Sequence, residues 1–154
     1  MPDVVLDAPL LLCAFALLVG GVSALLPLLP IEPLLLGASA TLPRPLLLPV
    51  VALATVGHMA AKTLLYLGSR GAVELALPAR HRASLDRVRR LLSRRRPVQL
   101  LTLLASAVAG VPPFYLVTVC YGVLRLPLRD YLVVGLIGRA VRFGALALLP
   151  RLFG

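Results

Sequence analysis

Long apolar runs, separated by short polar or proline-rich segments, dominate this sequence of 154 residues. Two runs, over residues 46–69 and 131–150, have no cluster of prolines in their interior, and two others, over residues 9–41 and 98–124, are interrupted by closely spaced prolines. Because one membrane crossing takes about 20 apolar residues, the first two of these runs predict transmembrane helices. The pattern predicts an all-α membrane protein that forms one domain over residues 1–154.

The first interrupted run predicts a helix followed by a re-entrant hairpin. Proline breaks a helix, and in hydrocarbon a broken backbone is tolerated only where protein or water satisfies its polar groups. We therefore expect a helix over residues 9–26, a re-entrant turn over residues 27–33 and a half-helix over residues 34–41. The turn contains one acidic residue, Glu32, and three prolines, which are Pro27, Pro30 and Pro33.

The second interrupted run repeats this organisation. Its break consists of Gly110, Pro112 and Pro113, so residues 98–124 predict a second re-entrant hairpin. The chain then reads as hairpin, spanning helix, basic loop, hairpin and spanning helix. Proline-interrupted segments in corresponding positions of two halves indicate a transporter built from inverted repeats, with its binding site where the breaks meet.

The two predicted spanning helices carry different features. Along residues 46–69, polar side chains recur every three to four residues and so fall on one helical face, which we expect to contact protein or a cavity; they are Thr55, His58, Lys62, Tyr66 and Ser69. The second helix contains Gly135 and Gly138, which allow close helix packing within one chain or between chains. A homo-oligomer is therefore one of the arrangements left open.

Composition and charge agree with a membrane protein. Hydrophobic residues make up 60% of the chain and charged residues only 14%, against about 25% charged in soluble domains. Most of the net charge of +10 comes from nine arginines in residues 70–97, which predicts a cytoplasmic loop by the positive-inside rule. Within it, residues 85–96 predict a basic amphipathic helix at the membrane surface, ended by Pro97. Without interleaved aromatic residues this loop does not indicate nucleic-acid binding.

The residues typical of enzymes and metal sites do not form a recognisable pattern. Cys13 and Cys120 lie far apart, with no further cysteine or histidine at metal-ligand spacing, and no phosphate-binding glycine loop or nucleophile motif is present. We therefore predict no catalytic residue, no metal and no cofactor. The N-terminus has no basic residue before its apolar run, so we expect the first apolar segment to be retained rather than cleaved.

Four charged residues in apolar segments are the candidate binding residues. A charge at the bilayer centre costs about 2.5–3.5 kcal/mol on insertion scales, so Glu32, Lys62, Arg139 and Arg142 need a reason for their positions. Three positive charges against one negative favour an anionic ligand, and the planar guanidinium suits phosphate. Two alternatives stay open: Glu32 pairs with one arginine and no ligand binds, or Glu32 carries protons.

Four local patterns in this order resemble the DedA family, whose shared region is also called the VTT or SNARE-associated domain. Pro27-Leu-Leu-Pro-Ile-Glu32-Pro resembles its first re-entrant motif, and Gly110-Val-Pro-Pro113 resembles its second. Tyr66-Leu-Gly68-Ser-Arg70-Gly71 is similar to the family's glycine-rich helix end, and Gly138-Arg139-Ala-Val-Arg142 to its closing helix. Lys62 is a departure, because many members have an acidic residue there.

The resemblance implies a multi-pass protein of the bacterial inner membrane that moves lipid between leaflets as a flippase or scramblase. The lipid would be polyprenyl phosphate or phospholipid. From the charges we predict that Arg139 and Arg142 receive the phosphate headgroup and that Glu32 lines the path, with Lys62 as a further candidate headgroup-binding residue. Two other functions remain: proton-coupled transport of a small solute or anion, and a non-transporting module that recruits partners through the arginine-rich loop.

Overall fold

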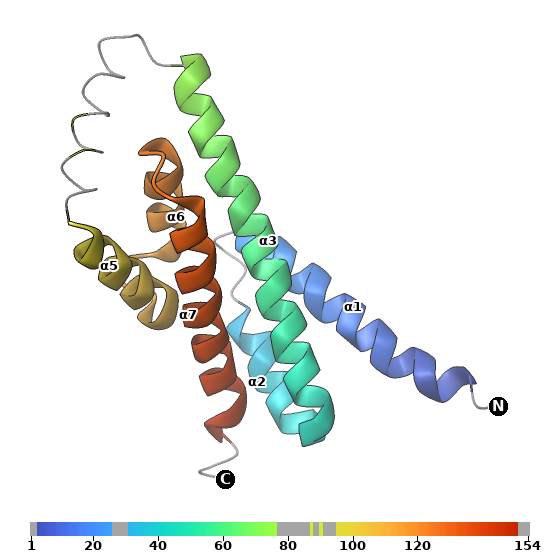
Figure 1. The fold of residues 1–154 in the computed structure, drawn as a ribbon. Helices are drawn as coiled ribbons and strands as arrows, with labels where there is room; N and C mark the ends of the chain where they lie inside the picture. The colour runs from blue at the N-terminus through green and yellow to red at the C-terminus, as the bar shows by residue number, and fades with distance from the viewer. Residues whose placement is uncertain (1–2, 26–30, 77–86, 88–89, 91–94, 151–154) are drawn as a thin grey trace. The chain divides into compact units, whose positions relative to one another are not determined.

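A computed structural model describes residues 3–25, 31–76, 87, 90 and 95–150 of the chain. Among these residues there are six helices and all the regular structure is α-helical, as the sequence predicts (Figure 1). The helices are α1 (Asp3–Leu25), α2 (Glu32–Thr41), α3 (Arg44–Ala76), α5 (Arg96–Ala109), α6 (Phe114–Val123) and α7 (Leu128–Leu148).

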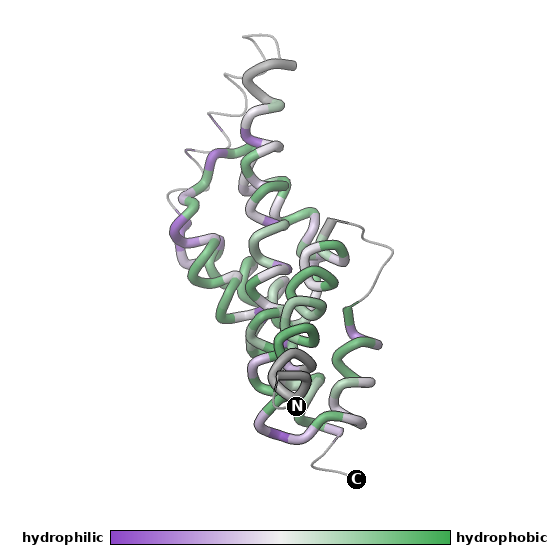
Figure 2. Tube along the Cα trace, turned by 90° about the vertical axis from the view of Figure 1, so that its right-hand side faces the viewer, coloured by the Kyte–Doolittle hydropathy of each residue, from purple (hydrophilic) through white to green (hydrophobic). Residues whose placement is uncertain are grey.

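Two helices in the described part of the chain are long and apolar enough to cross a membrane. They are Arg44–Ala72 within α3, with 29 residues, and α7, with 21 residues. At 1.5 Å per residue these lengths are about 43 and 32 Å, and a bilayer core is about 30 Å thick. Figure 2 shows hydrophobic residues along the helices that it colours. The apolar runs over residues 46–69 and 131–150 therefore form helices of spanning length.

Several helix ends differ from the sequence prediction. Helix α3 continues to Ala76 through residues 70–76, which the charge pattern assigned to the loop. The segment contains no proline before Pro78, so nothing in its backbone chemistry stops the helix at Ser69. Helix α7 begins at Leu128, three residues earlier than predicted.

The first predicted break ends earlier than expected, whereas the second lies at residues 110–113 as predicted. Helix α2 starts at Glu32 and not at Leu34, because Pro33 occupies the first helical turn, where the missing N–H costs no hydrogen bond. Pro97 was expected to end the amphipathic helix, but it lies in the first turn of α5 for the same reason. Pro27, Pro30 and most of residues 85–96 lie outside the described residues.

The chain divides into two compact units. The first comprises Met1–Ala61 and Arg139–Gly154, and the second comprises Lys62–Gly138. The long helices α3 and α7 each contribute residues to both units. The first unit has a hydrophobic core contributed by α1, α2, α3 and α7, whose buried members are Ala16, Ile31, Leu35, Val50, Ala54 and Phe143.

Glycine brings α1 and α3 into backbone contact in the first unit. A Cβ atom placed on Gly57 would overlap the carbonyl oxygen of Leu17, and one placed on Gly20 would overlap that of Ala54. Each helix contributes one glycine and one carbonyl to these two contacts, and on each helix the two residues are three positions apart, which is about one helical turn. Close approach of this kind is how small residues hold membrane helices together by van der Waals contact.

Helices α5 and α6 form a hairpin in the second unit. Gly110 ends α5 with a φ of 80°, a left-handed conformation that glycine adopts without a Cβ penalty. The Val111–Pro112 peptide bond is cis, and the Ser106 hydroxyl donates to the Pro112 carbonyl at 2.6 Å. At the other end, the Tyr121 hydroxyl donates to the Gln99 carbonyl at 3.1 Å.

Stacked aromatic rings form the core of the second unit. Tyr131 of α7 stacks on Tyr66 of α3, with ring centroids 5.3 Å apart, and on Phe114 of α6 at 6.0 Å. The hydroxyl of Tyr131 lies 3.1 Å from that of Thr118, and the buried Tyr66 hydroxyl donates to the Leu126 carbonyl at 2.6 Å. These hydrogen bonds fix the rings in a fully buried site.

Replacing Tyr66 by phenylalanine is expected to lower the free energy of unfolding by about 1–3 kcal/mol, because the buried Leu126 carbonyl loses its donor. Tyr115→Phe is the matched control, since that side chain is more than a third exposed. Thermal unfolding in detergent measures both. Equal stability of the two variants would contradict the prediction.

Candidate functional site

An ion pair within the first unit joins two of the four candidate charges. Arg142 Nη2 of α7 lies 2.9 Å from Glu32 Oε1, at the first residue of α2. Both side chains are mostly buried, with 25% and 31% of their surface exposed. The N-terminal turn of a helix also favours a carboxylate, because the helix dipole is positive there. Pairing of Glu32 with one arginine was one of the alternatives left open by the sequence, and in the structure Glu32 pairs with Arg142.

Arg139 adds a second positive charge close to this pair. It lies one turn before Arg142 on α7, is 8% exposed and interacts electrostatically with Glu32. Its guanidinium carbon lies 5.8 Å from the ring centre of Phe143, within range of a cation–π interaction. The same ring packs edge-to-face with buried His58, with centroids 5.4 Å apart. We call Glu32, Arg139 and Arg142 the charge cluster; its formal charge is +1.

The charge cluster borders apolar protein. Ile31, beside Glu32 in the chain, and Phe143, beside Arg142, both belong to the buried hydrophobic core. A groove of about 390 Å³ lies between α1 and α2, and its lining is almost wholly apolar. The lining includes Pro33, the residue after Glu32. Guanidinium groups in such low-dielectric surroundings bind phosphate or carboxylate more strongly than they do in water.

Lys62 belongs to the second unit and has a partner that the sequence did not indicate. Its side chain is 4% exposed, and Nζ lies 5.0 Å from the ring centre of Tyr115 on α6. A buried ammonium over an aromatic face gains a cation–π interaction that offsets part of its desolvation. Tyr115 lies 53 residues away in the chain, and no spacing rule connects the two.

The remaining candidate residues have structural surroundings. Pro33 lies in the first turn of α2, and Gly110, Pro112 and Pro113 make the break between α5 and α6. Gly135 and Gly138 are both buried on α7. A Cβ atom on Gly138 would lie 2.5 Å from that of Ala107 on α5, so this glycine allows close packing of the two helices.

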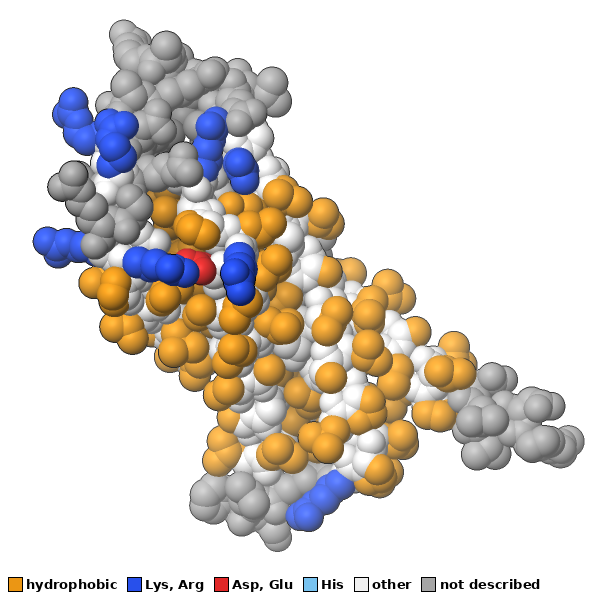
Figure 3. Space-filling model, in the orientation of Figure 1, with side chains coloured by type: hydrophobic (Ala, Val, Ile, Leu, Met, Phe, Trp, Pro, Cys, Tyr) orange, Lys and Arg blue, Asp and Glu red, His pale blue; other side chains and the backbone are white. Residues whose placement is uncertain are grey.

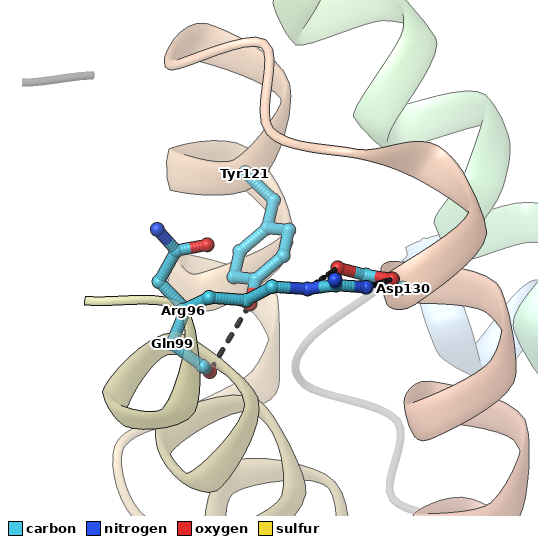
Figure 4. A network of polar contacts seen from close by, with 4 residues as sticks. All are labelled: Arg96, Gln99, Tyr121 and Asp130. Atoms are coloured by element: carbon cyan, nitrogen blue, oxygen red, sulfur yellow. Dashed lines mark hydrogen bonds and ion pairs between the residues drawn. The ribbon is translucent and has the colours of Figure 1, made fainter. Parts of the chain in front are cut away.

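A second polar group, which the sequence did not single out, joins the first turns of α5 and α7 (Figure 4). Arg96 donates through Nε and Nη2 to the two carboxylate oxygens of Asp130, at 3.0 and 2.9 Å. The bidentate hydrogen bond to Asp130 raises the pKa of Arg96 above its ordinary value. Asp130 is 13% exposed and Arg96 is 66% exposed, so the pair lies at the surface of the second unit.

No known protein family, curated protein or solved structure matches this chain. Among the described residues, no three of the types histidine, cysteine, aspartate and glutamate lie together as metal ligands would. The charge cluster and the apolar protein around it are therefore the features of this chain that bear on its function.

Proposed function

We propose that this chain is a multi-pass protein of the bacterial inner membrane that moves lipids with anionic phosphate headgroups between leaflets. The observation that supports it best is the charge cluster: one carboxylate and two guanidinium groups, mostly buried, beside an apolar core. Soluble proteins seldom place three charges so, whereas membrane transporters place them on substrate paths.

Exposed apolar surface supports a membrane location. Leu10, Leu11, Phe15 and Leu18 of α1 each expose more than half of their surface, and only about a third of the α7 residues are buried. In Figure 3, apolar side chains cover much of the visible face. Contact of such surface with water is unfavourable by roughly 25 cal/mol per Å², whereas contact with lipid tails is not.

Helix length supports the proposed re-entrant hairpins. Helices α2, α5 and α6 have 10, 14 and 10 residues, which at 1.5 Å per residue is about 15–21 Å. A bilayer core is about 30 Å thick, so none of the three can cross it alone. We infer that these short helices belong to two re-entrant hairpins, each of which enters and leaves the membrane on the same side. Each half of an inverted repeat would contain one hairpin.

The charge cluster suggests how a headgroup is received. With no lipid bound, Glu32 neutralises Arg142 and avoids the cost of an uncompensated buried charge. A lipid phosphate would replace the Glu32 carboxylate as the partner of Arg142. Arg139, one turn away, would neutralise the remaining negative charge of the phosphate. The acyl chains would stay in the surrounding hydrocarbon. Movement of lipid between leaflets is also the activity that the resemblance to the DedA family implies.

Leaflet exchange in liposomes tests the proposal. The purified chain is reconstituted with a trace of fluorescent phospholipid or fluorescent polyprenyl phosphate, and bleaching of the outer leaflet by dithionite reports exchange. In protein-free vesicles we expect dithionite to bleach only the half of the fluorescence that belongs to the outer leaflet. In vesicles that contain the protein we expect more than this half to be bleached. If neither lipid exchanges, the proposal is wrong. Exchange of a solute or anion that follows a pH gradient, and loses that dependence in Glu32→Gln, would favour the coupled alternative instead.

A further inference from the structure

The α5–α6 hairpin carries an apolar groove in the second unit, with a volume of about 300 Å³. This volume is at the lower end of the range for small-ligand sites. The first two turns of α5 and the length of α6 line the groove, and Leu116 and Cys120 of α6 are exposed. None of the described residues that line it is charged. The groove therefore suits a neutral and mostly apolar ligand.

One residue of the lining, Gln99, has a hydrogen-bond donor that no protein group accepts. Gln99 is 7% exposed, and its Nε2 is buried without a hydrogen-bond partner in the part of the chain that the structure describes. The two hydroxyls of the lining already donate, that of Thr102 to the Val98 carbonyl at 2.8 Å and that of Tyr121 to the Gln99 backbone carbonyl at 3.1 Å. Native proteins rarely bury a donor without an acceptor, because the donor has lost its hydrogen bonds to water. The Gln99 amide thus lacks an acceptor that a ligand can supply.

The side chain of Gln99 can present this donor to a ligand in the groove. The hydrogen bond from Tyr121 fixes the Gln99 backbone against α6 (Figure 4). The last torsion of a glutamine side chain is broad, so the amide N–H can turn toward the groove that the side chain lines at little cost. In the view of Figure 4 the Asp130 carboxylate lies on the other side of the Tyr121 ring, and it is bound to Arg96. This carboxylate is therefore not the acceptor for Gln99.

The position of Gln99 along α5 indicates which acceptor is at hand in a membrane. Gln99 comes three residues after Arg96, whose side chain is 66% exposed. At 1.5 Å per residue, at most about 4.5 Å along the helix separates them. The interfacial layer on each side of a bilayer core is about 5–8 Å thick. With Arg96 among the headgroups, Gln99 lies where the headgroups meet the hydrocarbon, which is the level of the lipid ester carbonyls.

We propose that the α5–α6 groove binds one ester-linked acyl chain of a membrane lipid, and that the ester carbonyl accepts a hydrogen bond from the side-chain amide of Gln99. The apolar lining contacts the hydrocarbon chain, and the amide selects a linkage that contains a carbonyl. The site rests on the membrane location in the proposed function and not on transport, because it lies in the second unit and uses no residue of the charge cluster.

Alkylation of Cys120 measures occupancy of the groove, because this thiol is exposed and lines it. Cys13→Ala protein is purified in dodecyl maltoside, which has no carbonyl group, and N-ethylmaleimide then reacts with Cys120 alone. The protein is mixed with diacyl phosphatidylcholine or with the dialkyl ether analogue of the same headgroup and chain length. We expect the ester lipid to halve the alkylation rate at a lipid fraction about 2- to 10-fold lower than the ether lipid, which is the range for one neutral hydrogen bond.

Gln99→Met removes the donor and keeps a side chain of similar length. Both lipids should protect this variant equally, at the fraction that the unsubstituted protein needs for the ether lipid. Without lipid it should unfold at the wild-type temperature or above, because a buried donor without an acceptor has been removed. Thr102→Val is the matched control. It removes a lining hydroxyl that already donates to Val98, so it should keep the preference for the ester lipid.

Four outcomes would overturn the site. Equal protection by the two lipids leaves the amide no role, and a preference that persists in Gln99→Met places the selecting group elsewhere. Equal slowing at Cys13 in Cys120→Ala protein marks a general effect of lipid on thiol reactivity. Protection that rises with protein concentration and not with lipid means that a second copy of the chain covers the groove. None of these results depends on leaflet exchange, so the site and the proposed transport fail separately.

Discussion

Arg142→Gln is expected to lower the initial rate of leaflet exchange about 10- to 100-fold. Arg142 holds the Glu32 carboxylate at 2.9 Å, and in the proposed mechanism it holds the lipid phosphate in the same place. A hydrogen bond to a charged group contributes about 1.5–3 kcal/mol. If this bond stabilises the lipid in the transition state for exchange and not in the leaflet, losing it slows exchange by about that factor. The measurement is exchange per reconstituted protein in the dithionite assay.

The loss must be separated from a loss of folding. Arg142→Gln leaves Glu32 as a mostly buried carboxylate without its ion pair, which destabilises the fold as well as the path. The double variant Glu32→Gln with Arg142→Gln removes both charges and leaves two neutral amides, so no buried charge is left unpaired at these two positions. We expect the double variant to unfold near the wild-type temperature and still to exchange lipid slowly.

Arg44→Gln provides the matched control, because Arg44 is an exposed arginine at the start of α3 in the same unit. It should exchange lipid at the wild-type rate. If the double variant exchanges as fast as the wild type, the charge cluster has no part in receiving the headgroup. If all three variants are slow, the assay reports general loss of charge and not the cluster.

The helices and their interruptions could be predicted because their causes are local. About 20 apolar residues define a spanning helix, and the closely spaced prolines at 112 and 113 separate α5 from α6. Single prolines did not break a helix, since Pro9 and Pro49 lie inside α1 and α3. Where a predicted break or helix end was wrong, the reason was equally local. Pro33 and Pro97 lie within first turns, so α2 and α5 begin before them and not after. Charge alone assigned residues 70–76 to a loop, although charge does not stop a helix.

The contacts of the candidate residues could not be predicted, because they depend on packing between distant segments. Sequence grouped Glu32 with three basic residues by charge. The ion pair to Arg142 spans 110 positions, and the choice between Arg142 and Arg139 depends on the rotation of α7. The partners of Lys62 and Tyr66, the Tyr115 ring and the Leu126 carbonyl, carry no motif. Neither Arg96 nor Asp130 was among the candidate residues.

Gly57→Ala is expected to destabilise the first unit by about 1–3 kcal/mol, although alanine favours helix formation by about 1 kcal/mol over glycine. The new methyl group would overlap the Leu17 carbonyl oxygen of α1. A backbone atom cannot turn aside as a flexible side chain does, so α1 must move away from α3. The reciprocal contact at Gly20 would then open too, because it is one turn further along both helices.

Gly68→Ala tests the same helix without the close contact. Gly68 also lies in α3, is exposed and has open space where the methyl group would go. It should therefore gain the helix propensity of alanine and unfold at the wild-type temperature or above it. Thermal unfolding in detergent compares the two variants. Equal shifts would mean that α1 does not rest on α3 at Gly57. Opposite shifts would show that this contact, rather than helix propensity, governs the stability of the first unit.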